Sequence, residues 1–392
     1  MGVKPQGARL RKPLERAVRD GHPWLFRDSL VDLRARPGEV VDVVDRRGRW
    51  LARGLADAGP IGVRVWTTQD EPLDGALLSR RLSAAAALRD AIIGADTTAY
   101  RLLHGEGDRV PGVVCDVYGS GAVLVFDGDG ARAWQREVTA ALTPILERRG
   151  VSSLLLREGK RENASVTPLL GDPPTGPLRV REHGVALLVD PAAGQKTGLF
   201  LDHRESRRMV RSLSSGLRVL NLYGYTGGFS VAAGLGGATS VDTIDIAGPA
   251  LELAARTWSD NGLPASAHTC RRADVPELLE EVRRTSRQWD LVISDPPSFA
   301  PRQSSVRAAL GAYERLHAAC LAVLAPGGLL LAASCSSHVT RDAFEETLRR
   351  AARAQRQQLQ VLSRWGAPAD HPRLLAFPEG DYLKVILART LA

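Results

Sequence analysis

Cysteine is scarce in this sequence. The chain has 392 residues but only four cysteines, Cys115, Cys270, Cys320 and Cys335, and no two of them form a C-x-x-C pair. The sequence therefore indicates neither a zinc site nor a redox dithiol, and we expect no metal. So few scattered thiols are typical of proteins that work in a reducing compartment such as the cytoplasm.

Long apolar runs are also lacking. No stretch approaches the roughly 20 apolar residues that a membrane-spanning helix needs. The first 24 residues, MGVKPQGARLRKPLERAVRDGHPW, contain no apolar segment of the kind found in secretion signals. We therefore expect a cytoplasmic protein without a membrane partner.

Lysine is scarce as well, although positive charge is not. Only five of the 52 basic residues are lysines, so arginine supplies almost all of the positive charge, and the formal net charge is +8. A GC-rich genome would explain the preference for arginine but not the net excess. Because an excess of positive charge attracts polyanions and speeds their encounter, we expect nucleic acid as a partner.

The length and the local patterns predict three domains. We expect a small β-rich domain over residues 1–72, in which residues 39–56 form a hairpin around the turn DRRG. Basic and aromatic residues open this domain. They form either a solvated surface with a tryptophan anchored in the core, or a face that contacts RNA: Arg9, Arg11, Lys12, His22 and Trp24.

The central part of the chain, residues 73–190, is expected to form an α+β domain. Apolar spacing predicts helices at 77–92 and 134–150, and the segment 111–128 predicts two strands around the turn YGSG. The proline- and glycine-rich stretch 167–180 is expected to be a loop.

From residue 191 to residue 392, short apolar runs alternate with helical segments. The runs are LRVLNL, SVDTIDI, SAHTC, WDLVIS and GLLLAASC. This alternation predicts an α/β fold with a doubly wound, mostly parallel, Rossmann-like sheet. Ligands of such sheets bind at the carboxyl ends of the strands, so the residues that follow each run are candidates for the site.

The first two strands are followed by a glycine-rich loop and an acid. In NLYGYTGGFS, Gly227 and Gly228 allow a helix N-terminus to approach a ligand closely, but the spacing is not that of the dinucleotide fingerprint. Asp245 follows the second strand, where a carboxylate can accept hydrogen bonds from both ribose hydroxyls of a nucleoside cofactor or cap a helix. Asp274, after the third strand, could bind an adenine amino group or cap the next helix.

The fourth and fifth strands end in DPPSF and SCSS. The two prolines fix a stiff turn that holds Asp295 at the tip of the strand, where its carboxylate could grip a planar base or a cofactor amine. A free cysteine is usually a small buried hydrophobe, but Cys335 stands at the tip of the neighbouring strand. A thiolate there could add to carbon-6 of a cytosine, which makes carbon-5 nucleophilic enough to accept a methyl group.

At these residues the chain resembles the bacterial 5-methylcytosine methyltransferases of large-subunit (23S) ribosomal RNA, which use S-adenosylmethionine. HPWLF and GRWLARG resemble their N-terminal PUA domain, and HGEGDRVPGVVCDVYG resembles their central linking domain. GQKTGLFLDHRESR, NLYGYTGGFS, SDPPSF, SCSSH and ADHPRLLAFPEGDYLK resemble their catalytic domain. The resemblance covers nearly the whole chain and implies a seven-stranded class I methyltransferase sheet, an RNA substrate and a homodimer as one allowed state.

The resemblance also implies roles for particular residues. Cys335 is the expected nucleophile. The base that removes the carbon-5 proton is open, because this chain carries no second cysteine in the motif after the fourth strand, and Asp295 or Glu379 could serve. The residues expected around the cofactor are Phe200, Asp202, Arg204, Asn221, Tyr225, Gly227, Gly228, Asp245, Ile246, Asp274 and Asp295.

Other functions remain open at this point. An enzyme that methylates an exocyclic amine, such as guanine N2, also carries D-P-P followed by an aromatic, although here Phe299 is displaced one place by Ser298. An RNA-binding ribosome-assembly factor with a degenerate catalytic domain is the alternative from another class. A nicotinamide dehydrogenase is disfavoured by the missing fingerprint.

Overall fold

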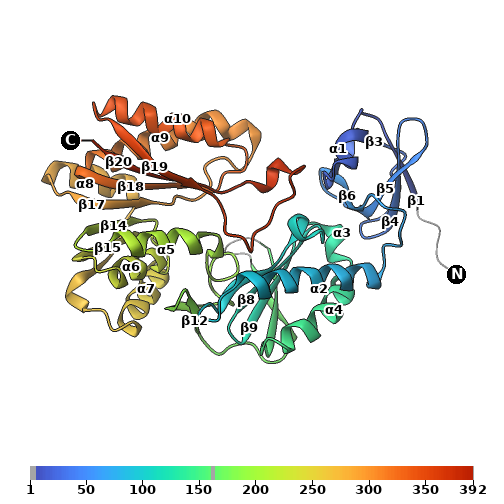
Figure 1. Cartoon of the computed structure of the whole chain (residues 1–392), viewed down its shortest axis with the longest axis horizontal. Coiled ribbons are helices and arrows are strands. Elements are labelled where there is room, and N and C mark those ends of the chain that lie inside the picture. The colour runs from blue at the N-terminus through green and yellow to red at the C-terminus, as the bar shows by residue number, and fades with distance from the viewer. Residues whose placement is uncertain (1–5, 160–163, 392) are drawn as a thin grey trace. The chain divides into compact units, whose positions relative to one another are not determined.

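The protein is described here by a computed structural model, which covers residues 6–159 and 164–391 (Figure 1). Its contacts divide the chain into two compact units. Unit 1 comprises residues 1–178, 190–198 and 369–380, and unit 2 comprises residues 179–189, 199–368 and 381–392. The three-domain division at residues 72 and 190 stays a prediction. Within the described ranges, no helix is long and apolar enough to cross a membrane.

Unit 1 begins with a six-stranded sheet in the order β2-β6-β5-β4-β1-β3. The expected hairpin at 39–56 is confirmed, since β4 and β5 pair antiparallel. Residues of β4 alternate between buried and half-buried positions, as expected for a strand with one face on the core. The elements are β1 (Gln6–Leu10), α1 (Glu15–Arg19), β2 (Trp24–Phe26), β3 (Leu30–Val31), β4 (Val40–Val44), β5 (Trp50–Ala56) and β6 (Ile61–Thr67).

The second sheet of unit 1 has five strands in the order β11-β10-β9-β8-β7. The two strands expected around YGSG are β8 and β9, which pair from Tyr118 opposite Gly121. Both expected helices form, and Asp74 caps α2 by accepting the amide hydrogens of Ala76 and Leu77 at 3.0 Å. The elements are α2 (Gly75–Ile92), β7 (Ala99–His104), β8 (Val113–Tyr118), β9 (Gly121–Phe126), α3 (Asp129–Arg132), α4 (Gln135–Glu147), β10 (Ser153–Glu158) and β11 (Ser165–Leu170).

The expected loop at 167–180 is partly wrong. Strand β11 includes Pro168, and a two-stranded ribbon of β12 (Leu178–Glu182) and β13 (Val185–Val189) starts before the stretch ends. Strand β11 lies at the edge of its sheet, where a proline costs no ladder hydrogen bond on the open side.

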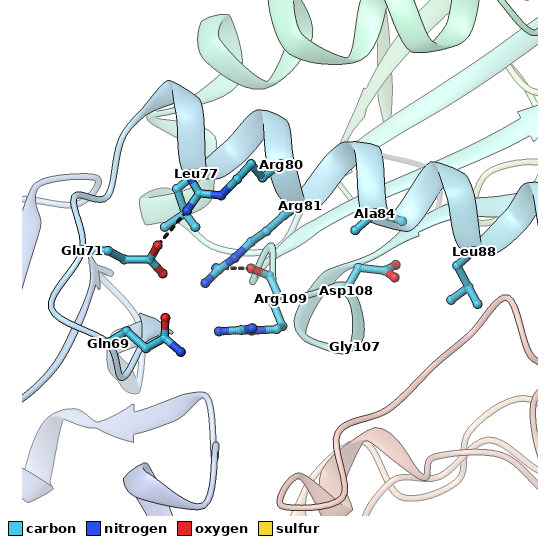
Figure 2. Close-up of a pocket in the computed structure, with 11 residues that line it drawn as sticks. Gln69, Glu71, Leu77, Arg80, Arg81, Ala84, Leu88, Gly107, Asp108 and Arg109 are labelled. Atoms are coloured by element: carbon cyan, nitrogen blue, oxygen red, sulfur yellow. Dashed lines mark hydrogen bonds and ion pairs between the residues drawn. The ribbon is translucent and has the colours of Figure 1, made fainter.

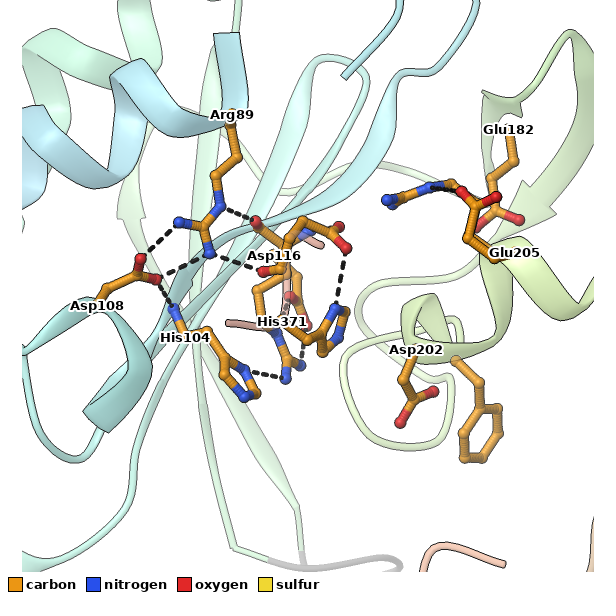
Figure 3. A network of polar contacts seen from close by, with 12 residues as sticks. Arg89, His104, Asp108, Asp116, Glu182, Asp202, Glu205 and His371 are labelled. Carbon is orange, nitrogen blue, oxygen red and sulfur yellow. Dashed lines mark hydrogen bonds and ion pairs between the residues drawn. The ribbon is translucent and has the colours of Figure 1, made fainter. Parts of the chain in front are cut away.

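A buried polar network explains why residues 369–380 group with unit 1 (Figure 3). The Arg89 guanidinium is fully buried, pairs with both carboxylate oxygens of Asp108, and donates to the carbonyl oxygen of Asp370 at 2.7 Å. The Asp370 carboxylate accepts the amide hydrogen of Arg101 at 3.0 Å and contacts the ring of His371. A buried charge needs such partners, so this segment is held by the central sheet.

Unit 2 contains a seven-stranded sheet in the order β16-β15-β14-β17-β18-β20-β19 (Figure 1). The five expected strands pair in parallel, and β20 runs antiparallel between β18 and β19. The elements are α5 (Arg204–Leu213), β14 (Arg218–Leu222), α6 (Gly228–Leu235), β15 (Ser240–Asp245), α7 (Gly248–Asp260), β16 (His268–Arg272), α8 (Val275–Thr285), β17 (Trp289–Ser294), α9 (Val306–Ala322), β18 (Leu324–Ser334), α10 (Arg341–Ala354), β19 (Leu359–Trp365) and β20 (Lys384–Thr390).

This order confirms the expected class I methyltransferase sheet. Strands β14, β17 and β18 are central and almost continuously apolar, as strands covered on both faces must be. Their carboxyl ends carry the loops that begin at Tyr223, Asp295 and Cys335. The fold thus gathers these loops along one edge of the sheet.

Candidate functional site

The glycine-rich loop after β14 is tied to the acid after β15. The Asp245 carboxylate accepts the amide hydrogen of Tyr225 on one oxygen and that of Ala247 on the other, both at 2.8 Å. The first bond holds Tyr225 at φ 47°, a left-handed conformation that is rare for a residue with a side chain. Asp245 is half-exposed and does not cap α7, whose N-cap is Ala247. Each carboxylate oxygen keeps a lone pair for a ligand.

The loop packs tightly against its surroundings at the glycines. Gly227 has φ 74°, and a Cβ there would lie 2.7 Å from the Cβ of Ala254 on α7. A Cβ on Gly228 would lie 3.0 Å from the Cδ of Arg207. Only glycine therefore lets the start of α6 come this close to both neighbouring elements.

An aromatic contact extends the site to the segment before α5. The rings of Phe200 and Tyr225 meet edge to face with centroids 5.3 Å apart. The carbonyl oxygen of Phe200 accepts a 3.0 Å hydrogen bond from Arg207, which is itself paired with both oxygens of the buried Glu182. The structure thus brings Phe200, Tyr225 and Asp245 into one continuous set of contacts.

Three other residues expected near the cofactor, Asn221, Ile246 and Asp274, differ in their burial. Asn221 is buried within β14, where its Nδ2 donates to Ser230 at 2.8 Å, and its Oδ1 has no hydrogen-bond partner among the described residues. The Ile246 side chain is 66% exposed, which is unusual for a large apolar residue. Asp274 is exposed and caps α8 by accepting the amide hydrogen of Glu277 at 3.2 Å, so the capping interpretation has direct structural support.

Asp202 and Arg204 are both buried, in the turn that precedes α5 and at its first residue. The Asp202 carboxylate accepts a 2.9 Å hydrogen bond from the Tyr382 hydroxyl just before β20. The Arg204 Nε lies 3.6 Å from the Glu205 carboxylate. Asp202 therefore connects the segment before α5 to the C-terminal strand of the sheet.

Asp295 is paired with a histidine that sequence reasoning missed. The His203 Nε2 lies 3.2 Å from Asp295, and its Nδ1 lies 3.2 Å from the Ser206 hydroxyl. The Trp365 indole donates to that same hydroxyl at 2.8 Å. The Asp295 side chain is 19% exposed and that of His203 only 3%, so the acid keeps some contact with solvent while the ring behind it is buried.

The backbone around Cys335 is held by a network of hydroxyl groups. The Tyr313 hydroxyl lies 2.9 Å from the Ser334 hydroxyl and 3.0 Å from that of Ser336. The Ser336 hydroxyl also lies 3.1 Å from the hydroxyl of Ser298 in the loop after β17. These contacts hold the residues on either side of the half-buried Cys335, so the two expected loops meet here and the backbone that carries the thiol is fixed.

A lysine that the sequence analysis did not single out lies at the same point. The side chain of Lys384, 1% exposed, donates to the carbonyl oxygens of Ser336 at 2.6 Å and of Tyr382 at 2.8 Å. Burial lowers the pKa of Lys384 to about 8, and a negative charge on Cys335 opposes that shift. The feature of the sequence that could have pointed to Lys384 is that lysine is rare in this chain, with only five in total.

Glu379 lies in the segment of unit 1 described above. Its carboxylate is 3.4 Å from the His22 Nε2, and the His22 ring contacts that of Phe377 with centroids 5.7 Å apart. Trp24 donates its indole hydrogen to Glu106 at 2.7 Å and packs edge to face on Phe377 at 4.6 Å. Trp24 and His22 are both half-buried and contact other residues of unit 1, and whether they also contact RNA stays a prediction.

The remaining residues of the expected RNA-contacting face are exposed. Arg9 lies 3.5 Å from Asp32, Lys12 lies 2.5 Å from Asp28, and Arg11 is exposed after β1. Exposed pairs of this kind contribute little to stability and exchange readily with other anions. Within residues 6–159 and 164–391, no three His, Cys, Asp or Glu side chains form a group that could hold a metal ion.

The carboxyl edge of the unit 2 sheet fits a sulfonium nucleoside. The Asp245 carboxylate, which keeps free lone pairs, follows β15, and the exposed side chain of Ile246 lies next to it. The aromatic pair of Phe200 and Tyr225 lies at the glycine-rich loop. The family model of the S-adenosylmethionine-dependent methyltransferases matches residues 132–383, and a PUA-like domain model matches residues 8–68.

Whole-chain relatives agree with these models. The chain is 37% identical over 396 residues to a protein of Erwinia tasmaniensis named ribosomal RNA large subunit methyltransferase I, with 97% of this chain and 98% of the relative covered. It is 36% identical over 394 residues to the protein of the same name from Shewanella amazonensis, at 97% and 98% coverage.

Solved structures show the same fold at lower identity. A protein from Streptococcus mutans described as a SAM-dependent methyltransferase superposes with a TM-score of 0.87 at 23% identity, covering 98% of this chain and 100% of that one. A methyltransferase structure in complex with SAH superposes equally well at 22% identity, covering 99% and 100%. The chain therefore belongs to the S-adenosylmethionine-dependent methyltransferases with an N-terminal PUA-like domain, in the family of the ribosomal RNA large subunit methyltransferases I.

Proposed function

We propose that this chain transfers a methyl group to carbon-5 of a cytosine in large-subunit ribosomal RNA, through a transient bond between Cys335 and carbon-6 of the base. The names of the relatives supply the substrate class. The observation that carries the chemistry is the half-buried Cys335, fixed at the tip of β18 beside the loop after β17 and next to a buried ammonium group.

The cofactor fits the residues present at the edge of the sheet. Asp245 would accept the ribose hydroxyls and Ile246 would cover a face of the adenine. Phe200, Tyr225 and Gly227 would line the methionine end, and Asp274 has one carboxylate oxygen beyond its capping bond for the adenine amino group. When bound, S-adenosylmethionine would supply an electrophilic methyl group, and its sulfonium sulfur would keep the electron pair of the broken S–CH3 bond as the neutral thioether S-adenosylhomocysteine.

The residues of the chain would prepare the base for that methyl group. The Cys335 thiolate would form a bond to carbon-6, which pushes electron density onto carbon-5. Carbon-5 takes the methyl group, a base removes the carbon-5 proton, and the carbon–sulfur bond breaks to restore the aromatic ring. The Lys384 ammonium favours the thiolate form of Cys335 at the start, because opposite charges attract strongly where water is excluded.

Two carboxylates stay candidates for the base that removes the proton. Asp295 follows β17, and its carboxylate lies 3.2 Å from the His203 Nε2. Glu379 lies beside His22 in unit 1. Both acids thus have an imidazole partner within 3.5 Å.

The substrate base must leave its stack to reach such a site, and basic residues of the PUA-like domain would hold RNA phosphates without reading sequence. Methylation of an exocyclic amine would need no thiol, and an assembly factor would need no methyl donor. Both alternatives are tested by Cys335→Ala, because only the proposed route loses activity while cofactor binding stays intact.

The experiment that tests the proposal maps 5-methylcytosine in 23S ribosomal RNA from cells that carry the gene, cells that lack it, and cells that carry only Cys335→Ala. We expect one cytosine to lose its methyl group in the second and third strains. A methyl group that persists with Cys335→Ala, or that sits on a guanine amine, would overturn the proposed chemistry.

A further inference from the structure

Unit 1 has a hollow of about 440 Å³ lined by residues of the β6–α2 connection, α2 and the turn before β8 (Figure 2). Its walls carry three arginines, Arg80, Arg81 and Arg109, and two acids, Glu71 and Asp108. This hollow is separate from every residue expected to bind the cofactor or RNA. The three arginines outnumber the two acids, so the lining of the hollow carries a net positive charge.

The two acids of the hollow are already engaged. Glu71 accepts a hydrogen bond from Arg80 at 2.6 Å and another from Thr67 at 2.9 Å. Both oxygens of Asp108 accept hydrogen bonds from Arg89, at 2.6 and 2.8 Å. Glu71 attracts the Arg81 charge, but within the described residues neither acid forms an ion pair with Arg81 or Arg109.

Arg81 is a buried charge whose recorded hydrogen bonds go to neutral acceptors. Its side chain is 7% exposed, and its guanidinium donates to the carbonyl oxygens of Trp66 and Arg109. Burial is the first cause that lowers the pKa of Arg81 to about 10, and repulsion by Arg109 is the second. Buried charges are normally paired with an opposite charge, so this one indicates a counter-ion supplied from outside.

Arg109 lines the same hollow. Its φ is 61°, in the left-handed region that residues with side chains seldom adopt. Figure 2 shows its side chain extending beneath the guanidinium of Arg81, and the residue is exposed. Among the residues that the structure describes, the Arg109 guanidinium has no ion-pair partner. Two like charges held together at an open hollow form an anion site, because a guanidinium fork matches two phosphate oxygens.

We propose that Arg81 and Arg109 bind one phosphodiester group of the RNA substrate in this hollow. The assignment of this phosphate to RNA rests on the proposed function. It would fix the register of the RNA strand on unit 1 and carry no sequence information, since phosphate contacts position a nucleic acid and base contacts specify it.

The test is the salt dependence of binding of the full-length protein to a fluorescent fragment of 23S ribosomal RNA. Arg109→Ala is the informative variant, because Arg109 is exposed and its loss leaves the buried carbonyl contacts of Arg81 intact. Arg148→Ala is the matched control: it removes one exposed arginine of unit 1 outside the hollow. Thermal melts confirm that both variants fold.

We expect Arg109→Ala to weaken binding about 3- to 10-fold at low salt and to reduce the slope of log K against log salt by about 0.7 to 0.9, the contribution of one phosphate. Arg148→Ala should keep the wild-type slope, and Arg109→Lys should restore most of the slope but not all of the affinity. Equal slopes for Arg109→Ala and Arg148→Ala would overturn the phosphate site alone. A wild-type protein that binds no RNA would overturn both this site and the proposed substrate.

Discussion

The Lys384 ammonium donates a 2.6 Å hydrogen bond to the carbonyl oxygen of Ser336, the residue that follows Cys335. Lys384 opens β20, where it pairs with Ser334 on β18. The strand register therefore places a buried positive charge beside the proposed nucleophile. This relationship gives the first prediction.

Lys384→Met should change how stability depends on pH. Burial lowers the pKa of Lys384 from 10.5 to about 8. Below pH 8 the group is charged in both the folded and unfolded states, and the full cost of burying the charge is present. Between pH 8 and 10.5 only the unfolded chain still holds the proton, so the free energy of unfolding rises with pH.

The measurement is urea unfolding of wild type and Lys384→Met from pH 7 to 10.5, each in a Cys335→Ser background so that the thiol does not titrate. We expect wild type to gain on the order of 1–2 kcal/mol relative to the variant over this range. A difference that stays constant with pH would show that Lys384 is not buried as a charged group. In the Cys335 background, Lys384→Met should also lower the methylation rate at least 10-fold.

Tyr313→Phe should slow methylation without weakening cofactor binding. The lost hydroxyl joins Ser334 and Ser336 on either side of Cys335, so the thiol would lose its fixed position. We expect kcat to fall about 10-fold and stability by about 1 kcal/mol. Calorimetry with S-adenosylmethionine should give an unchanged Kd. Ser298→Ala removes an outer hydroxyl of the same network and should cost less than 3-fold in kcat; losses of the same size would contradict this role of Tyr313.

Substitutions of Asp245 and of Asp274 should weaken the binding of S-adenosylmethionine to different extents. Asp245→Asn loses one acceptor for the ribose and disturbs the bond that holds Tyr225, so the Kd for S-adenosylmethionine should rise at least 10-fold. Asp274→Ser keeps a cap for α8, so stability should stay within about 0.5 kcal/mol while the Kd rises a few-fold. If Asp274→Ser binds the cofactor like wild type, Asp274 is a helix cap and nothing more.

Much of this site could be predicted from local sequence. Strand ends followed by glycine, acid or cysteine mark the carboxyl edge of a parallel sheet, and Asp245, Asp295 and Cys335 all lie there as expected. What could not be predicted depends on contacts between distant segments. Lys384 reaches the Cys335 loop only through antiparallel pairing of β20 with β18, and His203 reaches Asp295 across 92 positions (295 − 203).

The errors have physical reasons as well. Pro168 suggested a loop, but it lies in the edge strand β11, where a missing amide hydrogen is tolerated. The two interpretations of Trp24, an RNA contact or a core anchor, stay predictions, and its indole bond to Glu106, 82 residues away, is a contact that local sequence does not reveal.

Asp295→Asn and Glu379→Gln should behave differently if only one of them is the base. The variant that lacks the base still forms the bond from Cys335 to carbon-6 and transfers the methyl group, but it cannot remove the carbon-5 proton. It should therefore accumulate a covalent protein–RNA complex on a denaturing gel with wild-type RNA. The other variant should turn over without accumulating the complex; accumulation in neither would mean that another group removes the proton.

The most direct test of the proposed chemistry uses RNA that carries 5-fluorocytidine at the target position, because fluorine at carbon-5 cannot be removed as a proton. Incubation with S-adenosylmethionine should trap a methylated adduct, and mass spectrometry of tryptic peptides should place it on Cys335, with none formed by Cys335→Ala. Methylated product without an adduct, or an adduct on any other residue, would contradict covalent catalysis by Cys335.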